Sequence, residues 1–241
     1  MSLLTILFAV LLNFAVLVFV LGLARKIRSY ARTPAPLKIP TTPAPVTTAG
    51  VGWRMAREVV FFESLFKSSK WTWIFGWTFH AALLLVLLRH ARYFQEPVWL
   101  PVVLIQPFGT YAGFAMVAGL GGLWARRWLV DRVRYISTPS DHLMLALLLA
   151  IGLTGLGMRF VKHTDIVAVK VFMLGLLRFD WQPLPGDPVL LVHMALVALL
   201  MIIFPISKLL HAPGLFFSPT RNQTDNAREL RHVSAWTNAL D

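Results

Sequence analysis

The sequence of 241 residues contains no cysteine. Disulfide bridges, thiolate-held iron–sulfur clusters and thioether-attached haem are therefore excluded within this chain, because each needs cysteine sulfur. Charged residues are scarce, at 14%, and acidic ones most of all, with 11 Asp and Glu against 23 Lys and Arg. No acidic pair, nucleophile–base arrangement or phosphate-binding loop stands out, so we expect no hydrolytic or ion-coupling catalytic residues.

Hydrophobic residues, in contrast, make up 57% of the chain, and the mean hydropathy is +0.66. This composition predicts an all-α polytopic membrane protein, a single membrane domain over residues 1–241 built as a bundle of five transmembrane helices. The first apolar run could be a signal peptide. It lacks a preceding basic segment and a small-residue cleavage site, so a first span is favoured. The expected spans are 3–24, 71–93, 98–124, 141–160 and 188–211.

The segments between these spans are also informative. Residues 32–51 hold five prolines and predict an extended connector, for which a spacer is favoured over a peptide-recognition motif. Residues 53–70 predict an interfacial amphipathic helix, and residues 162–187 a longer loop whose first half lies in the interface. Residues 212–241 form a polar tail.

Local signals refine two of the spans. Pro101 and Pro107, with Gln106 and Gly109, predict a broken or re-entrant start of the third span. Ser140 or Asp141 is expected to cap the fourth, and Pro205 to kink the fifth.

The distribution of basic residues predicts the orientation of the bundle. With the N-terminus outside and the C-terminus in the cytoplasm, 17 of the 23 Lys and Arg fall on the inner side. The connector 32–51 and the tail 212–241 are then cytoplasmic. The net charge of +12 is interpreted as affinity for anionic lipid, and nucleic-acid binding is not expected because no soluble basic module is visible.

Four histidines lie in the second and fifth predicted spans, where an ionisable side chain is costly and suggests a functional site. His80 and His90 are ten residues apart, and His193 and His211 eighteen. On one helix the second pair would share a face and lie roughly 27 Å apart, close to the ~30 Å thickness of the hydrocarbon core.

Antiparallel packing of these two spans would match the histidines in pairs. His80 would face His211 near the inner surface, and His90 would face His193 near the outer one. Two bis-imidazole sites at different depths suit two b-type haems, with the four histidines as the iron ligands. A lone buried histidine is more often a hydrogen-bonded core residue, so the hypothesis depends on both pairs.

Basic residues near each pair are candidates to bind the haem propionates, although ordinary snorkelling to the interface explains them equally well. Arg89 and Arg92 flank the outer pair, and Lys208 lies near the inner one. His142 is expected to cap a helix or face water. His163 is expected to be a solvated loop residue, with proton relay to a quinone as the alternative.

The residues FH in the second span, the histidine ten positions later, and VH and FPISKLLHAP in the fifth span resemble the nitrate reductase gamma subunit family of membrane cytochromes b. The resemblance covers about Trp71 to Ala212, with the same order of five helices. The tail HAPGLFFSPTRNQTDN is most similar to the branch found in sulfite-reductase-associated electron transport complexes.

That resemblance implies a function. Members of this branch exchange electrons between the quinone pool and an iron–sulfur protein of heterodisulfide-reductase type in dissimilatory sulfur metabolism. It implies a quinone site on the outer side, a cytoplasmic iron–sulfur partner, further membrane and periplasmic redox subunits, and a bacterial or archaeal cytoplasmic membrane. The quinone-site lysine of the nitrate branch has no clear equivalent here; Thr110 and Tyr111 lie near its expected place.

Other functions remain open at this point. The chain could be the gamma-type cytochrome b subunit of a nitrate reductase. A transporter or a structural anchor without haem is a different class, and it would bind no pigment. A transporter would also be expected to carry an internal repeat or a charged pathway, which the sequence lacks. Hydrogenase- and formate-dehydrogenase-type subunits place their ligands differently.

Overall fold

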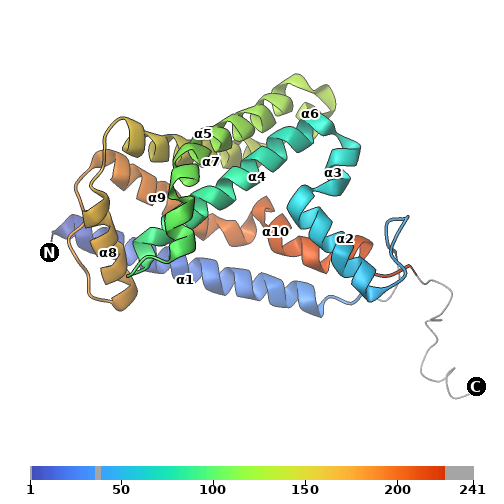
Figure 1. Cartoon of the computed structure of the whole chain (residues 1–241), viewed down its shortest axis with the longest axis horizontal. Coiled ribbons are helices and arrows are strands. Elements are labelled where there is room, and N and C mark those ends of the chain that lie inside the picture. The colour runs from blue at the N-terminus through green and yellow to red at the C-terminus, as the bar shows by residue number, and fades with distance from the viewer. Residues whose placement is uncertain (1, 36–38, 226–241) are drawn as a thin grey trace, which may run out of the picture. The chain divides into compact units, whose positions relative to one another are not determined.

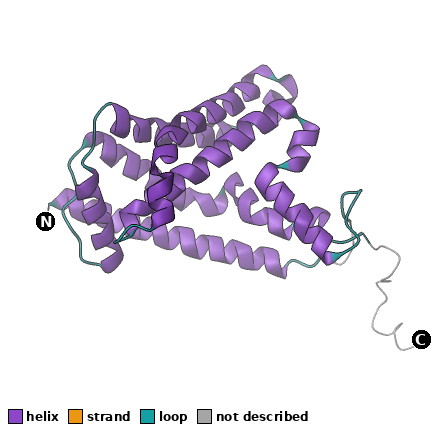
Figure 2. Cartoon of the chain, viewed as in Figure 1, coloured by secondary structure: helices purple, strands orange, loops and turns teal. Residues whose placement is uncertain are grey.

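The computed structural model describes residues 2–35 and 39–225 and consists there of helices and loops, with no strand (Figure 1, Figure 2). The predicted all-α class is confirmed. Parts of the predicted connector (36–38) and of the predicted tail (226–241) lie outside the described residues. The helices are α1 (Leu3–Arg32), α2 (Thr48–Phe61), α3 (Glu63–Ser68), α4 (Lys70–His90), η1 (Ala91–Phe94), α5 (Leu100–Leu129), α6 (Asp131–Ile136), α7 (Pro139–Phe160), α8 (Ile166–Arg178), α9 (Pro188–Ile203), η2 (Phe204–Ile206), η3 (Lys208–Leu210), α10 (His211–Gly214), η4 (Leu215–Phe217) and α11 (Pro219–Asn222).

Five segments of the described chain are long and apolar enough to cross a bilayer, which confirms the five predicted spans. They are Leu3–Arg32, Lys70–Phe94, Leu100–Leu129, Pro139–Phe160 and Pro188–Ile206. The first helix continues past its predicted end at residue 24. The basic residues that follow are good helix formers, so the hydrogen-bonded ladder persists beyond the apolar stretch.

The chain packs as two compact units. The first comprises Met1–Phe19 and Leu65–Ile203, and the second comprises Val20–Ser64 and Phe204–Asp241. In the first unit consecutive spanning helices are neighbours: α4 packs on α5, α5 on α7, and α7 on α9 (Figure 1). The helix α8 packs on η1.

The backbones of α4 and α5 approach each other closely at two glycines. A Cβ atom placed on Gly119 would lie 2.9 Å from both the carbonyl oxygen of Phe75 and the amide nitrogen of Phe79. A Cβ on Gly109, near the other end of the contact, would lie 2.8 Å from the Cβ of Arg89. Small residues allow helices to approach closely where dispersion contacts hold them together in lipid.

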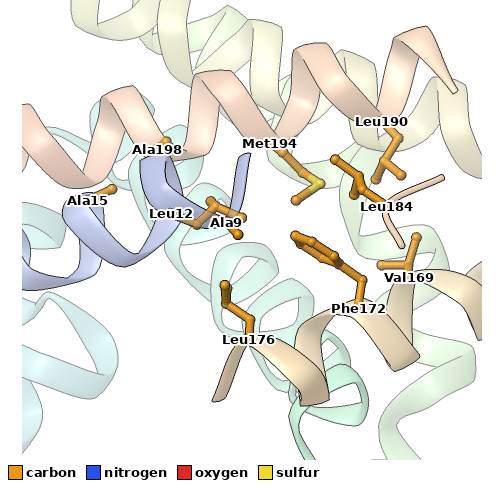
Figure 3. Packing of buried hydrophobic residues seen from close by; sticks show 10 residues of the cluster. All are labelled: Ala9, Leu12, Ala15, Val169, Phe172, Leu176, Leu184, Leu190, Met194 and Ala198. Carbon is orange, nitrogen blue, oxygen red and sulfur yellow. The ribbon is translucent and has the colours of Figure 1, made fainter. Parts of the chain in front are cut away.

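A buried apolar cluster joins α1, α8 and α9 within the first unit (Figure 3). From α1, Ala9 and Ala15 are fully buried, and Ala198 of α9 is fully buried with them. The ring of Phe172 from α8 has no exposed surface and points into the same cluster. The loop before α9 is tied to α1, because the amide of Leu184 donates to the buried hydroxyl of Thr5 at 3.1 Å.

The second unit is held by polar contacts between the connector, α2 and the tail. Arg221 pairs with Glu58 of α2 at 3.0 Å, and the amide of Thr41 donates to the carbonyl of Thr220 at 3.0 Å. Arg54 of α2 is buried and donates to the carbonyl of Thr41 at 2.9 Å. The connector is therefore an ordered part of this unit over the residues described.

The structure corrects two sequence-based predictions about the starts of spanning helices. The third span is not broken or re-entrant: α5 is continuous from Leu100 to Leu129 and contains Pro107. Pro101 lies in its first turn, where no backbone donor is needed. The N-cap of the fourth span is Thr138 and not Ser140; the predicted Asp141 does take part in the cap, as the third helical residue of a capping box with Thr138.

Other differences lie in the interfacial segments. The predicted single helix over 53–70 is two helices, α2 and α3, because Phe62 adopts a left-handed conformation with φ 51°. The predicted loop over 162–187 contains α8, whose start is capped by the Asp165 side chain. These short-range features depend on capping and on single residues, which apolar periodicity does not report.

The predicted fifth span over 188–211 is also wrong at its end. The helix α9 ends at Ile203, and the chain continues in short 3-10 turns around Pro205, which has no backbone N–H to extend the ladder. A Cβ on Gly22 would lie 2.6 Å from Pro205, so this turn packs tightly against α1. His193 and His211 are therefore not on one continuous helix, contrary to the sequence argument.

We predict that Gly119→Ala destabilises the protein by about 1–3 kcal/mol, because the new methyl group meets backbone atoms of α4 that cannot move cheaply. Gly121→Ala on the same helix is the matched control, since a Cβ there meets nothing within 4 Å. Thermal unfolding in detergent should show a lower midpoint for the first variant only. Equal midpoints for both variants would contradict the close approach.

Candidate haem site

The first unit brings two of the four candidate histidines face to face. His90 is the last residue of α4, and His193 lies in the second turn of α9. Their ring centroids are 6.4 Å apart and their planes differ by 13°. Both residues are partly buried. The antiparallel arrangement of α4 and α9 that pairing requires is thus present at this end of the bundle.

Hydrogen bonds fix the ring nitrogens of this pair. The Nδ1 of His90 lies 2.7 Å from the carbonyl oxygen of Val86, and the Nδ1 of His193 lies 2.9 Å from the hydroxyl of Thr154 on α7. A carbonyl oxygen only accepts, so the Nδ1 of His90 carries the proton. Metal-ligating histidines commonly donate their second nitrogen in this way.

The pair fits axial ligation of a haem iron. A metal bound on both sides by imidazole has a metal–nitrogen distance of about 2 Å, which places the two ring centres roughly 6 Å apart. The observed separation of 6.4 Å matches that requirement. The protonated Nδ1 of His90 leaves its Nε2 as the nitrogen with a lone pair. Among the described residues, no group of three or more His, Asp or Glu side chains could hold a metal ion.

The other two candidate ligands lie in different units. His80 is in the middle of α4 in the first unit, and its Nδ1 lies 2.7 Å from the carbonyl oxygen of Gly76. His211 is in the second unit, and its Nδ1 lies 2.9 Å from the carbonyl oxygen of Lys208. Each imidazole is oriented as a ligating histidine would be, by a carbonyl at Nδ1.

The three basic residues named from the sequence have defined contacts. Arg89 donates to the backbone oxygen of Gln106 at 3.0 Å and to the hydroxyl of Thr110. Arg92 donates to the side-chain oxygen of Gln106 at 3.1 Å. Both arginines therefore tie the end of α4 to α5. Lys208 contributes its backbone carbonyl to His211.

Gln106 is the centre of this network, whereas the sequence predicted for it only a part in a broken start of the third span. Its amide nitrogen donates to the carbonyl of Val102 at 2.9 Å, which orients its side-chain oxygen toward Arg92. A glutamine in an apolar span with two arginines at the end of the preceding span was the available signal. Tyr111, in contrast, is exposed on α5, with its ring 6.2 Å from that of Phe160.

The two remaining histidines of the described chain lie outside the pair. The sequence predicts that His142 caps a helix or faces water, but in the structure its ring contacts two tryptophans. Its Nδ1 accepts from the indole of Trp124 at 3.0 Å, and its ring lies 4.8 Å from that of Trp128. His163 is exposed in the loop after α7.

Two features of the loop before α9 were not found from sequence. The indole Nε1 of Trp181 is buried and has no hydrogen-bond partner within the described structure, although Trp181 packs against the cluster that includes Met194. Asp187 accepts from the hydroxyl of Thr164 and from the amide of Val189 at 2.9 Å, so it caps the helix that carries His193.

The fold and this pair together define the class: a multi-pass helical membrane protein in whose bundle two imidazole rings face each other. The model of the nitrate reductase gamma subunit family matches residues 45–226. A protein named Hdr-like menaquinol oxidoreductase cytochrome b-like subunit from Archaeoglobus fulgidus is 37% identical over 92% of this chain and 80% of its own length. A protein of the same name from Archaeoglobus profundus is 34% identical over 91% and 79%.

This chain belongs to the nitrate reductase gamma subunit family. The family resemblance inferred from the histidine spacing is confirmed, and so is the predicted location as a multi-pass protein of a bacterial or archaeal membrane.

We predict an acid-sensitive start of α9. The Thr164 hydroxyl, together with the amides of Val189 and Leu190, lowers the pKa of Asp187 below its ordinary value of about 3.9. The stabilisation is fully present above the unfolded pKa and is lost as pH falls through the lower folded pKa. Unfolding midpoints should therefore fall more steeply below about pH 4 in the wild type than in Asp187→Asn. Parallel pH curves would contradict this role.

Proposed function

We propose that this chain is the dihaem b subunit of a quinol-linked electron-transfer complex. One haem would be held by His90 and His193, and the other by His80 and His211. The face-to-face placement of the His90 and His193 rings carries this proposal. The second pair is supported by the FH and FPISKLLHAP residues, which carry the family resemblance, and by the carbonyl at each Nδ1.

Haem iron supplies one-electron transfer when bound. The chain's own residues would hold and tune it. The carbonyl of Val86 and the hydroxyl of Thr154 orient the two rings, and the apolar helices keep bulk water from them. Arg89, Arg92 and Lys208 are our candidates to bind the propionates, through donors beyond those already engaged by α5.

A quinol would dock at the end of the bundle that carries His90 and His193. The relatives are named as menaquinol oxidoreductase subunits, which supports a quinol as the electron donor or acceptor here. The buried indole N–H of Trp181 supports a quinol site at this end of the bundle, because a quinone carbonyl oxygen would accept a hydrogen bond from that unpaired donor. Tyr93 and Trp181 both pack against the cluster of α1, α8 and α9.

Electrons would pass between the two haems and a separate iron–sulfur subunit of heterodisulfide-reductase type on the cytoplasmic side. The chain has no cysteine and cannot hold such a cluster itself, which requires a partner for this chemistry. The excess of basic residues on the inner side supports the orientation, with the N-terminus outside. Further membrane and periplasmic redox subunits and a role in dissimilatory sulfur metabolism belong to the same proposal.

Two other functions make different predictions. A gamma subunit serving nitrate reductase would share both haem pairs but would require a different soluble partner. The names of the two relatives favour a subunit of a menaquinol oxidoreductase over a subunit of a nitrate reductase. A transporter or haem-free anchor would bind no pigment at all.

We predict that His193→Ala and His90→Ala each remove the same haem and leave the other, because the two rings are the axial ligands of one iron. The measurement is the pyridine haemochrome count per chain of purified protein, with the reduced-minus-oxidised spectrum. Wild type should contain two b-type haems, and each variant one.

The matched control is His163→Ala, which removes an exposed loop imidazole and should keep both haems. Wild-type haem content in His193→Ala would refute the ligand assignment. A folded wild-type preparation without haem would refute electron transfer and favour the anchor or transporter.

We predict that Trp181→Phe raises the KM for a menaquinol analogue by roughly 2- to 10-fold, the worth of one neutral hydrogen bond, with little change in kcat. Haem content and spectrum should stay as in wild type, because Trp181 is not a ligand. An unchanged KM would place the quinol elsewhere. Trp128→Phe, at the far end of α5 and exposed, is the control.

A further inference from the structure

The hydrogen bond to His193 differs from those of the other three candidate ligands. His80, His90 and His211 each direct Nδ1 to a backbone carbonyl three or four residues earlier in the chain. His193 directs Nδ1 across to another helix, where it meets the Thr154 hydroxyl at 2.9 Å. Mutation can remove the Thr154 hydroxyl, whereas it cannot remove the backbone carbonyls that bind the other three histidines.

The hydrogen bonds of Thr154 determine which way the proton lies. Its Oγ1 is 2.7 Å from the carbonyl oxygen of Ala150 and 3.0 Å from that of Ile151. The single hydroxyl proton is donated to one of these carbonyls, since both only accept. The hydroxyl oxygen is then an acceptor for His193, so Nδ1 is the protonated nitrogen and Nε2 keeps the lone pair.

We propose that Thr154 is a positioning residue that fixes the tautomer and ring orientation of His193 and lowers the reduction potential of the haem bound by His90 and His193. This inference rests on the proposed function. The relay from N–H to hydroxyl to carbonyl polarises each bond in turn. An acceptor at Nδ1 makes Nε2 a stronger donor, which stabilises the oxidised iron relative to the reduced iron.

The Thr154 hydroxyl is the side-chain link between α7 and the ring, beside a backbone hydrogen bond of His193 with Ile151 on the same helix. A Cβ placed on Gly155, the residue after Thr154, would lie 3.5 Å from the Cε1 of His193, which is ordinary contact and does not constrain the ring strongly. Gly152 serves packing instead, because a Cβ there would lie 2.9 Å from Met116 of α5. The hydroxyl is therefore the link to α7 that a substitution can remove.

The test compares Thr154→Val, which keeps the shape and removes the hydroxyl, with Thr154→Ser, which keeps the hydroxyl. Both variants are titrated electrochemically in the visible region, and haem is counted per chain. The haem lost in His193→Ala identifies the relevant signal. We expect a higher midpoint potential for that haem in Thr154→Val, an unchanged potential for the other haem, and wild-type values in Thr154→Ser.

Selective loss of the same haem in Thr154→Val, with both haems retained in Thr154→Ser, would also support the proposal, because it shows that the hydroxyl holds the ligand. Unchanged potentials in Thr154→Val would overturn it, and so would equal shifts in both variants, which indicate packing. These outcomes differ from failure of the proposed function, in which wild-type protein contains no haem.

Discussion

The facing imidazoles of His90 and His193 are the contact on which the candidate site depends. Polar rings are costly in hydrocarbon unless their nitrogens have partners. Each ring satisfies Nδ1 within the protein, one through Val86 and one through Thr154. The remaining nitrogen of each ring requires its own partner, and a metal between the rings would satisfy both at once. Three helices, α4, α7 and α9, must hold their positions for this arrangement to exist.

Close packing of α4 on α5 supplies much of that rigidity. Gly119 lets the backbones meet near the middle of α4, and Gly109 lets α5 approach Arg89 near its end. Arg89 and Arg92 then reach α5, where each donates to Gln106. A charge within a span is tolerated because the neighbouring helix accepts its hydrogen bonds. The same bonds hold the last turn of α4, where His90 lies.

The sequence was sufficient to predict the helical class, the five spans and the pairing of His90 with His193. Long apolar runs report spans directly, and histidines in such runs are rare enough to be informative. The sequence was not sufficient to predict the contact between Thr154 and His193. A single hydroxyl in an apolar helix forms no recognisable motif, and its partner depends on which residue of α9 lies opposite it. The straight helix assumed between His193 and His211 was wrong, because Pro205 ends α9 early.

Several polar side chains of the spanning helices in the first unit gather at the end of the bundle that holds His90 and His193. The end of α4, the beginning of α5, the last turns of α7 and the beginning of α9 meet there because consecutive helices alternate in direction. Gln106, Thr110 and Thr154 come from these turns, as do both histidines. Each would be costly alone in lipid, but together they satisfy one another. Under the proposed function, this concentration of polar groups would keep one haem near one membrane surface, where a quinol from the bilayer and protons from water would both be accessible.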